Sequence, residues 1–333
     1  MLCMILVSCT GQKTGKENDN NDKIAIEVGE IKFPPQDVLQ LKSYYLSSSV
    51  HVDSIDYLIG YNYRLHSLDC MNLKSKSVTQ IVLPGDGPDA IVRLSGIYAQ
   101  SLDSVWISDE SERAFLIDSV GTIKRMIDLK KYLEDQEQLL INTNYAMFTS
   151  HLFYNASRHS LMFLVKHTPS NTFIVKEAFI DEVGKMATYQ LSSSKVVPDM
   201  SKGYAYINFP NVNFVGENIV YNYPVESSIY MLDIRTNERK YILADSHYTS
   251  NIIEKCTTSG DYATLEKHWL ENSHFYDIMY LPKYKIYARL HADKVDFDEK
   301  KGMEKLINER DLYLMLFDEN MEKIGETKLS NCR

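Results

Sequence analysis

The chain has 333 residues and a formal net charge of −9, from 36 Lys and Arg against 45 Asp and Glu. Hydrophobic residues make up 44% and charged residues 24%, which is ordinary for a globular protein with a buried core. The acidic balance disfavours nucleic-acid binding, because a negative field repels phosphate and the sequence contains no basic stripe. The length suits one large all-β domain or two ordinary domains.

The N-terminus predicts a membrane anchor. Residues 1–7 are apolar, and Leu6-Val7-Ser8-Cys9 fits the lipobox of bacterial lipoproteins. Cleavage before Cys9 exposes a cysteine that carries acyl chains, and two chains suffice for stable anchoring. A truncated ordinary signal peptide is the alternative, since no Lys or Arg precedes Cys9. We predict a signal peptide over residues 1–9, lipidation at Cys9 and a place in the cell envelope as an outer-membrane lipoprotein.

Residues 10–23 are polar and have no β-branched residue other than Thr, a composition typical of a flexible tether. From residue 24 onward the sequence alternates like β-strands. Cys70, Cys256 and Cys332 are widely separated and show no metal-ligand spacing. We therefore predict one domain over residues 24–333, with no metal and no cofactor.

Four later segments repeat one design, an apolar strand that reaches an Asp, then a polar turn and a second strand that closes on Leu. The segments are Arg64–Leu83, Arg113–Leu129, Ser228–Leu243 and Asp311–Leu329. A hairpin recurring at wide spacing is typical of a β-propeller, in which each copy is the outer edge of one blade. The predicted fold class is all-β, a β-propeller with short helical insertions.

The number of blades follows from the spacing of the turn Asp residues. A less regular blade is predicted over residues 146–191, and short helices are predicted over residues 130–141 and 262–272. These segments together give five blades. We expect the N-terminal strands near residues 24–42 to complete a sixth blade, because an open ring would leave strand edges unpaired. Five or seven blades are the alternatives.

With these blades in place, the chain resembles a family of uncharacterised six-bladed propeller lipoproteins from Bacteroidetes-type bacteria. The resemblance covers most of residues 24–330 and is most distinctive in the GDGPDAI sequence. The segments that carry it are 58–62, 83–91, 103–107, 278–280 and 287–289. The family has no established activity, so the resemblance implies a fold and an anchor but no functional residues.

Candidate binding residues come from propeller topology. Loops that join one blade to the next lie on the same face as the loops between the second and third strands of each blade, and polar groups on this face surround the mouth of the central channel. The residues predicted to bind a ligand there are Asn62, Arg64, Asp86, Asp89, Asp109, Arg113, Tyr223, Arg289 and His291.

We therefore predict a ligand-binding or protein-interaction module. Tyr-rich loops such as Tyr61/Tyr63 and Tyr221/Tyr223 favour a saccharide, a peptide or an envelope protein as the partner. The alternative is a propeller hydrolase or lyase with its site at the channel mouth. No catalytic motif favours it: the sequence has no GxSxG elbow, and its histidines are scattered.

Overall fold

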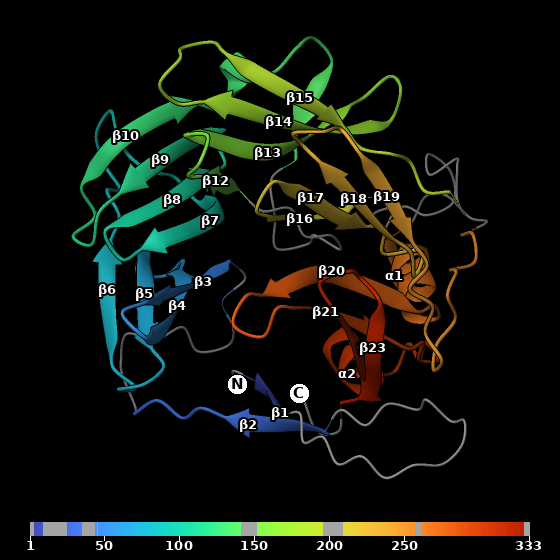
Figure 1. Ribbon diagram of the computed structural model, residues 1–333. Helices are drawn as coiled ribbons and strands as arrows, with labels where there is room; N and C mark the ends of the chain where they lie inside the picture. Colours follow the sequence, from blue (N-terminus) through green and yellow to red (C-terminus); the bar gives the residue numbers. More distant parts are fainter. Residues whose placement is uncertain are drawn as a thin grey trace. The chain divides into compact units, whose positions relative to one another are not determined.

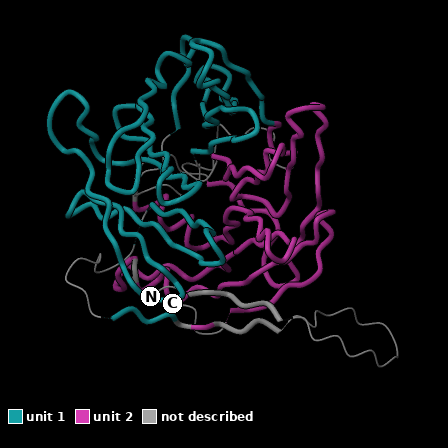
Figure 2. The backbone as a smooth tube through the Cα atoms, turned by 60° about the vertical axis from the view of Figure 1, so that its left-hand side comes forward, with its two compact units in different colours: residues 1, 31–145, 150–191 teal, residues 2–30, 146–149, 192–333 magenta. Residues whose placement is uncertain are grey.

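The computed structural model describes residues 3–8, 25–34, 44, 46–140, 152–195, 209–256 and 262–329. The chain divides into two compact units, coloured separately in Figure 2. Unit 1 comprises residues 1, 31–145 and 150–191, and unit 2 comprises residues 2–30, 146–149 and 192–333. The predicted lipidation site, Cys9, and the predicted tether lie outside the described residues.

Unit 1 contains three antiparallel sheets, and in the first two each strand is the neighbour of the next strand in sequence (Figure 1). The first sheet is β3 (Ser47–Val52), β4 (Ile55–Asn62), β5 (Ser67–Asn72) and β6 (Val78–Val82). The second is β7 (Leu94–Ser101), β8 (Ser104–Asp109), β9 (Arg113–Ile117) and β10 (Ile123–Asp128), followed by a 3-10 helix (Leu129–Tyr132). The third is β11 (Glu137–Leu139), β12 (Phe153–Asn155), β13 (Ser160–His167), β14 (Thr172–Phe179) and β15 (Met186–Gln190), with β11 and β12 both paired to β13.

Unit 2 contains two further four-stranded sheets with the same sequential order. One is β16 (Asn211–Val215), β17 (Asn218–Asn222), β18 (Ile229–Asp233) and β19 (Arg239–Ile242). The other is β20 (His274–Leu281), β21 (Ile286–Ala292), β22 (Leu312–Phe317) and β23 (Lys323–Lys328). Two short helices, α1 (Tyr262–Leu270) and α2 (Met303–Glu309), lie in the connections. A separate pair of strands, β1 (Cys3–Ser8) and β2 (Ala25–Glu30), forms a two-stranded sheet.

The predicted outer hairpins are confirmed. The repeated segments form the pairs β5–β6, β9–β10, β18–β19 and β22–β23. Asp118, Asp233 and Asp318 sit at the turns, where each carboxylate accepts backbone N–H groups of the residues that follow. Such Asx turns stabilise the reversal of the chain.

The first hairpin differs from the prediction. The turn is held by the side chain of Asn72, which accepts the N–H groups of Lys74 and Ser75. Asp69 is instead fully buried within β5. Its carboxylate accepts hydrogen bonds from Tyr44 and Asn62, at 2.6 and 3.0 Å. Buried polar groups require such partners, so Asp69 is part of the interior of the sheet.

The described residues contain five blade-like sheets, whereas the sequence analysis favours six. β2 pairs only with β1 in the described structure and does not begin another four-stranded sheet. The long connection after β19 forms loops and α1, and the charged segment 294–310 contains the unpredicted helix α2. The predicted helix at residues 130–141 is a single 3-10 turn followed by β11, whereas the helix predicted at residues 262–272 is confirmed as α1.

Each unit has its own apolar interior. In unit 1, Ile59, Leu68, Val105 and Phe115 belong to one buried cluster between the first and second sheets. In unit 2, Val220, Ile278 and Met315 belong to another. No helix in the described part of the chain has the length and apolar character needed to cross a membrane.

Candidate functional site

A pocket of about 790 Å³ lies in unit 1, at one end of the first and second sheets. Its wall comes from the segment before β3, the end of β4 with the turn that follows, and the loop between β6 and β7. The described lining residues are Leu46, Tyr61, Tyr63, His66, Gly85, Ile91, Val92, Arg93 and Leu94. A wall of apolar and aromatic side chains with a few polar groups is typical of a small-molecule site, and this volume lies within the range of such sites.

The turn between β4 and β5 brings two polar rings of the pocket together. The hydroxyl of Tyr61 lies 3.0 Å from Nδ1 of His66, and the backbone of Leu94 also hydrogen-bonds to this hydroxyl. His66 adopts a left-handed φ of 50°, and its carbonyl accepts the N–H of Leu83, which ties the turn to the end of β6. Burial raises the pKa of the Tyr61 phenol, so this group keeps its proton at neutral pH.

Arg93 supplies the charge in the pocket. Its Nε lies 3.4 Å from a carboxylate oxygen of Glu110, and both side chains are 50% exposed. The backbone carbonyl of Arg93 also accepts the N–H of Glu110 at 2.9 Å. An ion pair this exposed contributes between about 0 and 1 kcal/mol to stability, so the guanidinium can exchange partners at low cost.

The predicted site residues in the first sheet and the loop that follows it fall into two groups. Arg64, Asp86 and Asp89 are exposed on the two loops that form the pocket, but they are not among the described lining residues. Asn62 is buried; its side chain donates to Asp69 and accepts the N–H of Leu65. Asn62 therefore shapes the turn that carries Tyr63 and His66. A ligand-binding role for these four residues stays a prediction.

Asp109 and Arg113 form a partly buried ion pair at the turn between β8 and β9. Nη2 of Arg113 lies 2.8 Å from the fully buried carboxylate of Asp109 and also donates to the carbonyl of Ala90. Asp109 accepts the N–H of Val92 as well. The pair thus holds the loop that contributes Ile91, Val92 and Arg93 to the pocket, so its contacts are those of a support for the pocket.

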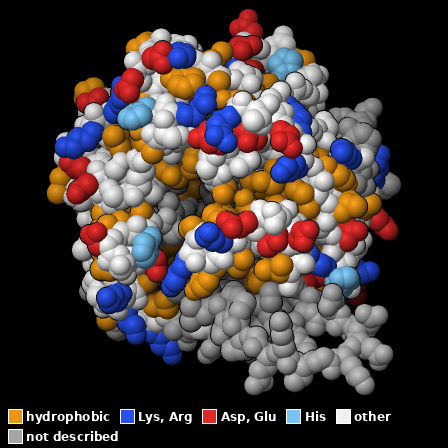
Figure 3. Space-filling model, viewed as in Figure 1, with side chains coloured by type: hydrophobic (Ala, Val, Ile, Leu, Met, Phe, Trp, Pro, Cys, Tyr) orange, Lys and Arg blue, Asp and Glu red, His pale blue; other side chains and the backbone are white. Residues whose placement is uncertain are grey.

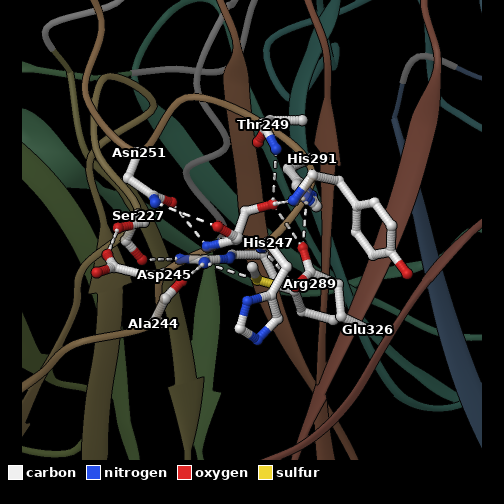
Figure 4. Close-up of polar contacts among 12 residues, drawn as sticks. Ser227, Ala244, Asp245, His247, Thr249, Asn251, Arg289, His291 and Glu326 are labelled. Carbon is white, nitrogen blue, oxygen red and sulfur yellow. Dashed lines mark hydrogen bonds and ion pairs between the residues drawn. The ribbon is translucent and has the colours of Figure 1, made fainter. Parts of the chain in front are cut away.

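A second polar site lies in unit 2. We call it the Arg289 cluster; it consists of Ser227, Asp245, Ser246, Asn251, Arg289, His291 and Glu326, and Figure 4 labels all of these except Ser246. Arg289 is fully buried on β21 and donates to the carbonyls of Ser227 and Ala244 and to Sδ of Met315. Its guanidinium lies over the ring of Phe275, 4.9 Å from the ring centroid. Burial lowers the pKa of Arg289 to about 9, so it is cationic at neutral pH.

His291, Ser246 and Glu326 contact one another within this cluster. Nε2 of His291 lies 3.1 Å from the Ser246 hydroxyl and 3.0 Å from the Glu326 carboxylate. The Ser246 hydroxyl donates to the same carboxylate oxygen at 2.6 Å. Burial, with the charges of Arg289 and Lys323, lowers the pKa of His291 to about 3, so its ring is neutral at pH 7.

This arrangement is not a catalytic relay. A relay needs the carboxylate on one ring nitrogen and the hydroxyl on the other. Here both partners meet Nε2, while Nδ1 of His291 has no hydrogen-bond partner among the described residues. The Ser246 hydroxyl proton already goes to Glu326, and all three side chains are buried. The cluster therefore serves to order the interior of unit 2.

Tyr223 is the remaining predicted site residue, and it is also buried in unit 2. Its hydroxyl donates to the carbonyl of Ser192, and its ring meets Tyr221 and Tyr230 edge-on. Burial raises the pKa of Tyr223 well above its ordinary value. Tyr223, Arg289 and His291 are thus turned toward interior partners, and the prediction that they bind a ligand is untested.

His66 and Arg93 are polar lining residues that the sequence analysis does not name. Tyr61 and Tyr63 could be found from the sequence, because two Tyr residues flank the end of a predicted strand. His66 and Arg93 had no comparable signal, because they reach the pocket only when the loop after β6 folds back on the turn after β4. Among the described residues, no three His, Cys, Asp or Glu side chains are grouped so that they could hold a metal ion. On the face drawn in Figure 3, basic and acidic side chains are interspersed.

The five sheets of sequential antiparallel strands, together with two short α-helices, define a mainly-β propeller fold for the described part of the chain. The chain belongs to the family "Domain of unknown function (DUF4221)", which matches residues 17–328. No curated protein matches the chain. The predicted propeller fold and membership of a family without an established activity are therefore confirmed, whereas the lipoprotein character of the predicted family stays a prediction.

One solved structure of the same family supports this fold. The crystal structure of a DUF4221 member from Bacteroides vulgatus has a TM-score of 0.68 at 14% identity, covering 89% of this chain and 84% of that chain. Hsv2 from Kluyveromyces lactis has a TM-score of 0.41 at 9% identity, covering 85% and 62%. BamB from Moraxella catarrhalis has a TM-score of 0.33 at 9% identity, covering 84% and 60%. The first similarity supports the fold, and the other two carry no further argument.

Proposed function

We propose that this protein is a ligand-binding propeller and that the pocket of unit 1 is where a saccharide or peptide binds. The observation that carries the proposal is the described pocket wall, in which Tyr61, Tyr63 and His66 lie with apolar side chains and Arg93. Aromatic faces stack on sugar rings and on peptide groups, while hydroxyl and guanidinium groups orient the ligand by hydrogen bonds.

The experiment is a screen of the purified protein against a glycan array and a peptide library, followed by titration of each hit. Tyr63→Ala removes a ring that lines the pocket and is 49% exposed. We expect it to weaken binding about tenfold and to leave the unfolding temperature unchanged. Tyr248→Ala is the matched control, because Tyr248 is 51% exposed in unit 2. Equal affinity of both variants and wild type would show that ligands bind elsewhere.

We further propose that the protein acts in the cell envelope, held to the outer membrane by acyl chains on Cys9. The lipobox Leu6-Val7-Ser8-Cys9 supports this proposal. Mass spectrometry of the protein extracted from native membranes should give an N-terminal fragment that starts at Cys9 and carries acyl chains. A Cys9→Ser variant should leave the membrane fraction. An unmodified N-terminus in the soluble fraction would rule out the lipid anchor but would not affect the proposal for the pocket.

A further inference from the structure

The pocket holds a guanidinium whose terminal nitrogens make no hydrogen bond to the residues that the structure describes. Among the described lining residues, Arg93 is the only Arg, Lys, Asp or Glu. Its contact with Glu110 is made through Nε at 3.4 Å, and its two terminal nitrogens make no hydrogen bond within the described part of the chain. The side chain is half exposed, so a ligand can reach these nitrogens.

A guanidinium fork fits a carboxylate with two parallel hydrogen bonds, and this geometry selects planar anions. Two tyrosine rings line the same pocket, at Tyr61 and Tyr63. A sugar ring presents an apolar face to an aromatic ring and hydroxyls around its edge. We propose that the ligand is an acidic oligosaccharide, bound with its sugar carboxylate on Arg93 and its ring on the tyrosines; this rests on the proposed function of the pocket.

The charged side chain of the described lining, Arg93, favours an anion over a cation at this position, although acidic side chains lie nearby. Asp86 and Asp89 are exposed on the same loop, but they do not belong to the described lining. Glu110 also lies outside the described lining, and its carboxylate contacts Nε of Arg93. A ligand carboxylate in the pocket can therefore bind the guanidinium of Arg93, in competition with the carboxylate of Glu110. Glu110 acts as an internal competitor that reduces affinity.

The test is a glycan array of uronate- and sialate-terminated oligosaccharides, each printed beside its neutral methyl ester. We expect acidic members to bind and their esters to bind at least tenfold more weakly. Titrations with the best acidic member then compare variants. Arg93→Gln should weaken binding about tenfold, Arg93→Lys should recover part of the loss, and Glu110→Gln should tighten binding about two- to fivefold.

The matched control is Arg125→Gln. Arg125 forms a surface ion pair with Asp181 at 3.0 Å, with exposed fractions of 43% and 61%, and it does not line the pocket. This variant should bind like wild type. Circular dichroism and unfolding temperature check that every variant is folded.

Different results would rule out the acidic ligand and the pocket itself. If esters bind as tightly as acids, or if Arg93→Gln binds like wild type, the acidic ligand is ruled out while a Tyr63-dependent ligand keeps the pocket as a binding site. If only peptides with a carboxylate bind, the proposal that the ligand is a saccharide is also ruled out. If no glycan or peptide depends on Tyr63, both proposals fall.

Discussion

Two fully buried cations, one in each unit, have different surroundings. In unit 1, Nζ of Lys176 lies 3.0 Å from carboxylates of both Glu134 and Glu137. In unit 2, Arg289 is fully buried and forms no ion pair with a described carboxylate; carbonyls and aromatic rings surround it.

The difference teaches where to look for function. A buried polar group without a partner of opposite charge is a common sign of a catalytic site. In the Arg289 cluster, however, Ser246, His291 and Glu326 are buried, and the Ser246 hydroxyl donates to the Glu326 carboxylate. The pocket of unit 1 has weaker and more exposed contacts, such as Arg93 with Glu110, that a ligand can replace. Solvent access, together with replaceable partners, marks the better candidate site.

The largest expected effect is at Arg289. Arg289→Ala should lower the free energy of unfolding by about 5 kcal/mol, because it leaves a cavity between aromatic rings and takes donors from two buried carbonyls. Arg235→Ala removes an exposed Arg of the same unit and should change it by less than about 0.5 kcal/mol. Urea denaturation measures both. A loss below about 1 kcal/mol for Arg289→Ala would show that this cluster is not structural.

A buried ion pair should behave differently from Arg289. Lys176→Met should cost about 3 kcal/mol, because it leaves the carboxylate of Glu137, which is only 3% exposed, without its cation. The double variant Lys176→Met/Glu137→Leu removes both charges and should recover most of that loss. Denaturation of the two variants side by side tests this. If the double variant is as unstable as the single one, the loss of stability comes from altered packing and not from the unpaired carboxylate.

Acid should destabilise unit 2 through two histidines. Burial lowers the pKa of both His274 and His291 to about 3, while the unfolded chain titrates near 6.5. Because the folded pKa is the lower one, their stabilisation is full above pH 6.5 and declines between 6.5 and about 3. The slope is about 1.4 kcal/mol per pH unit for each ring.

His291→Gln isolates one of these rings. Glu326, Ser246, Arg289 and Lys323 surround His291 and remain in place, so the difference between wild type and variant reports this imidazole. Unfolding free energies measured from pH 7 to pH 5 should fall less steeply in the variant. Parallel pH profiles would mean that His291 is protonated in the folded protein.

The outer hairpins could be predicted because each is local: an apolar strand, an Asx turn and a second strand follow one another, as at Asp118 and Asp318. The blade count could not, because it depends on short strands such as β11 and on how far the insertions form strands. A local sequence pattern also does not predict the pairing between β1 and β2.

The candidate site was only partly predictable for a similar reason. Topology pointed to the loops that hold Tyr63 and Asp86, and the pocket lies between these loops. Arg289 and His291 were expected at an exposed mouth, but β21 is a second strand of its sheet and is buried on both faces. Alternation of residue types in sequence does not show which polar side chains face the interior.

One pair of variants tests the division between an open pocket and a closed cluster most directly. Affinity for the best glycan and the free energy of unfolding are measured for Tyr63→Ala and Ser246→Ala. We expect Tyr63→Ala to lose affinity about tenfold with stability within about 0.5 kcal/mol of wild type, and Ser246→Ala to lose about 1–3 kcal/mol of stability with unchanged affinity. A folded Ser246→Ala that no longer binds, beside a Tyr63→Ala that binds normally, would contradict the account.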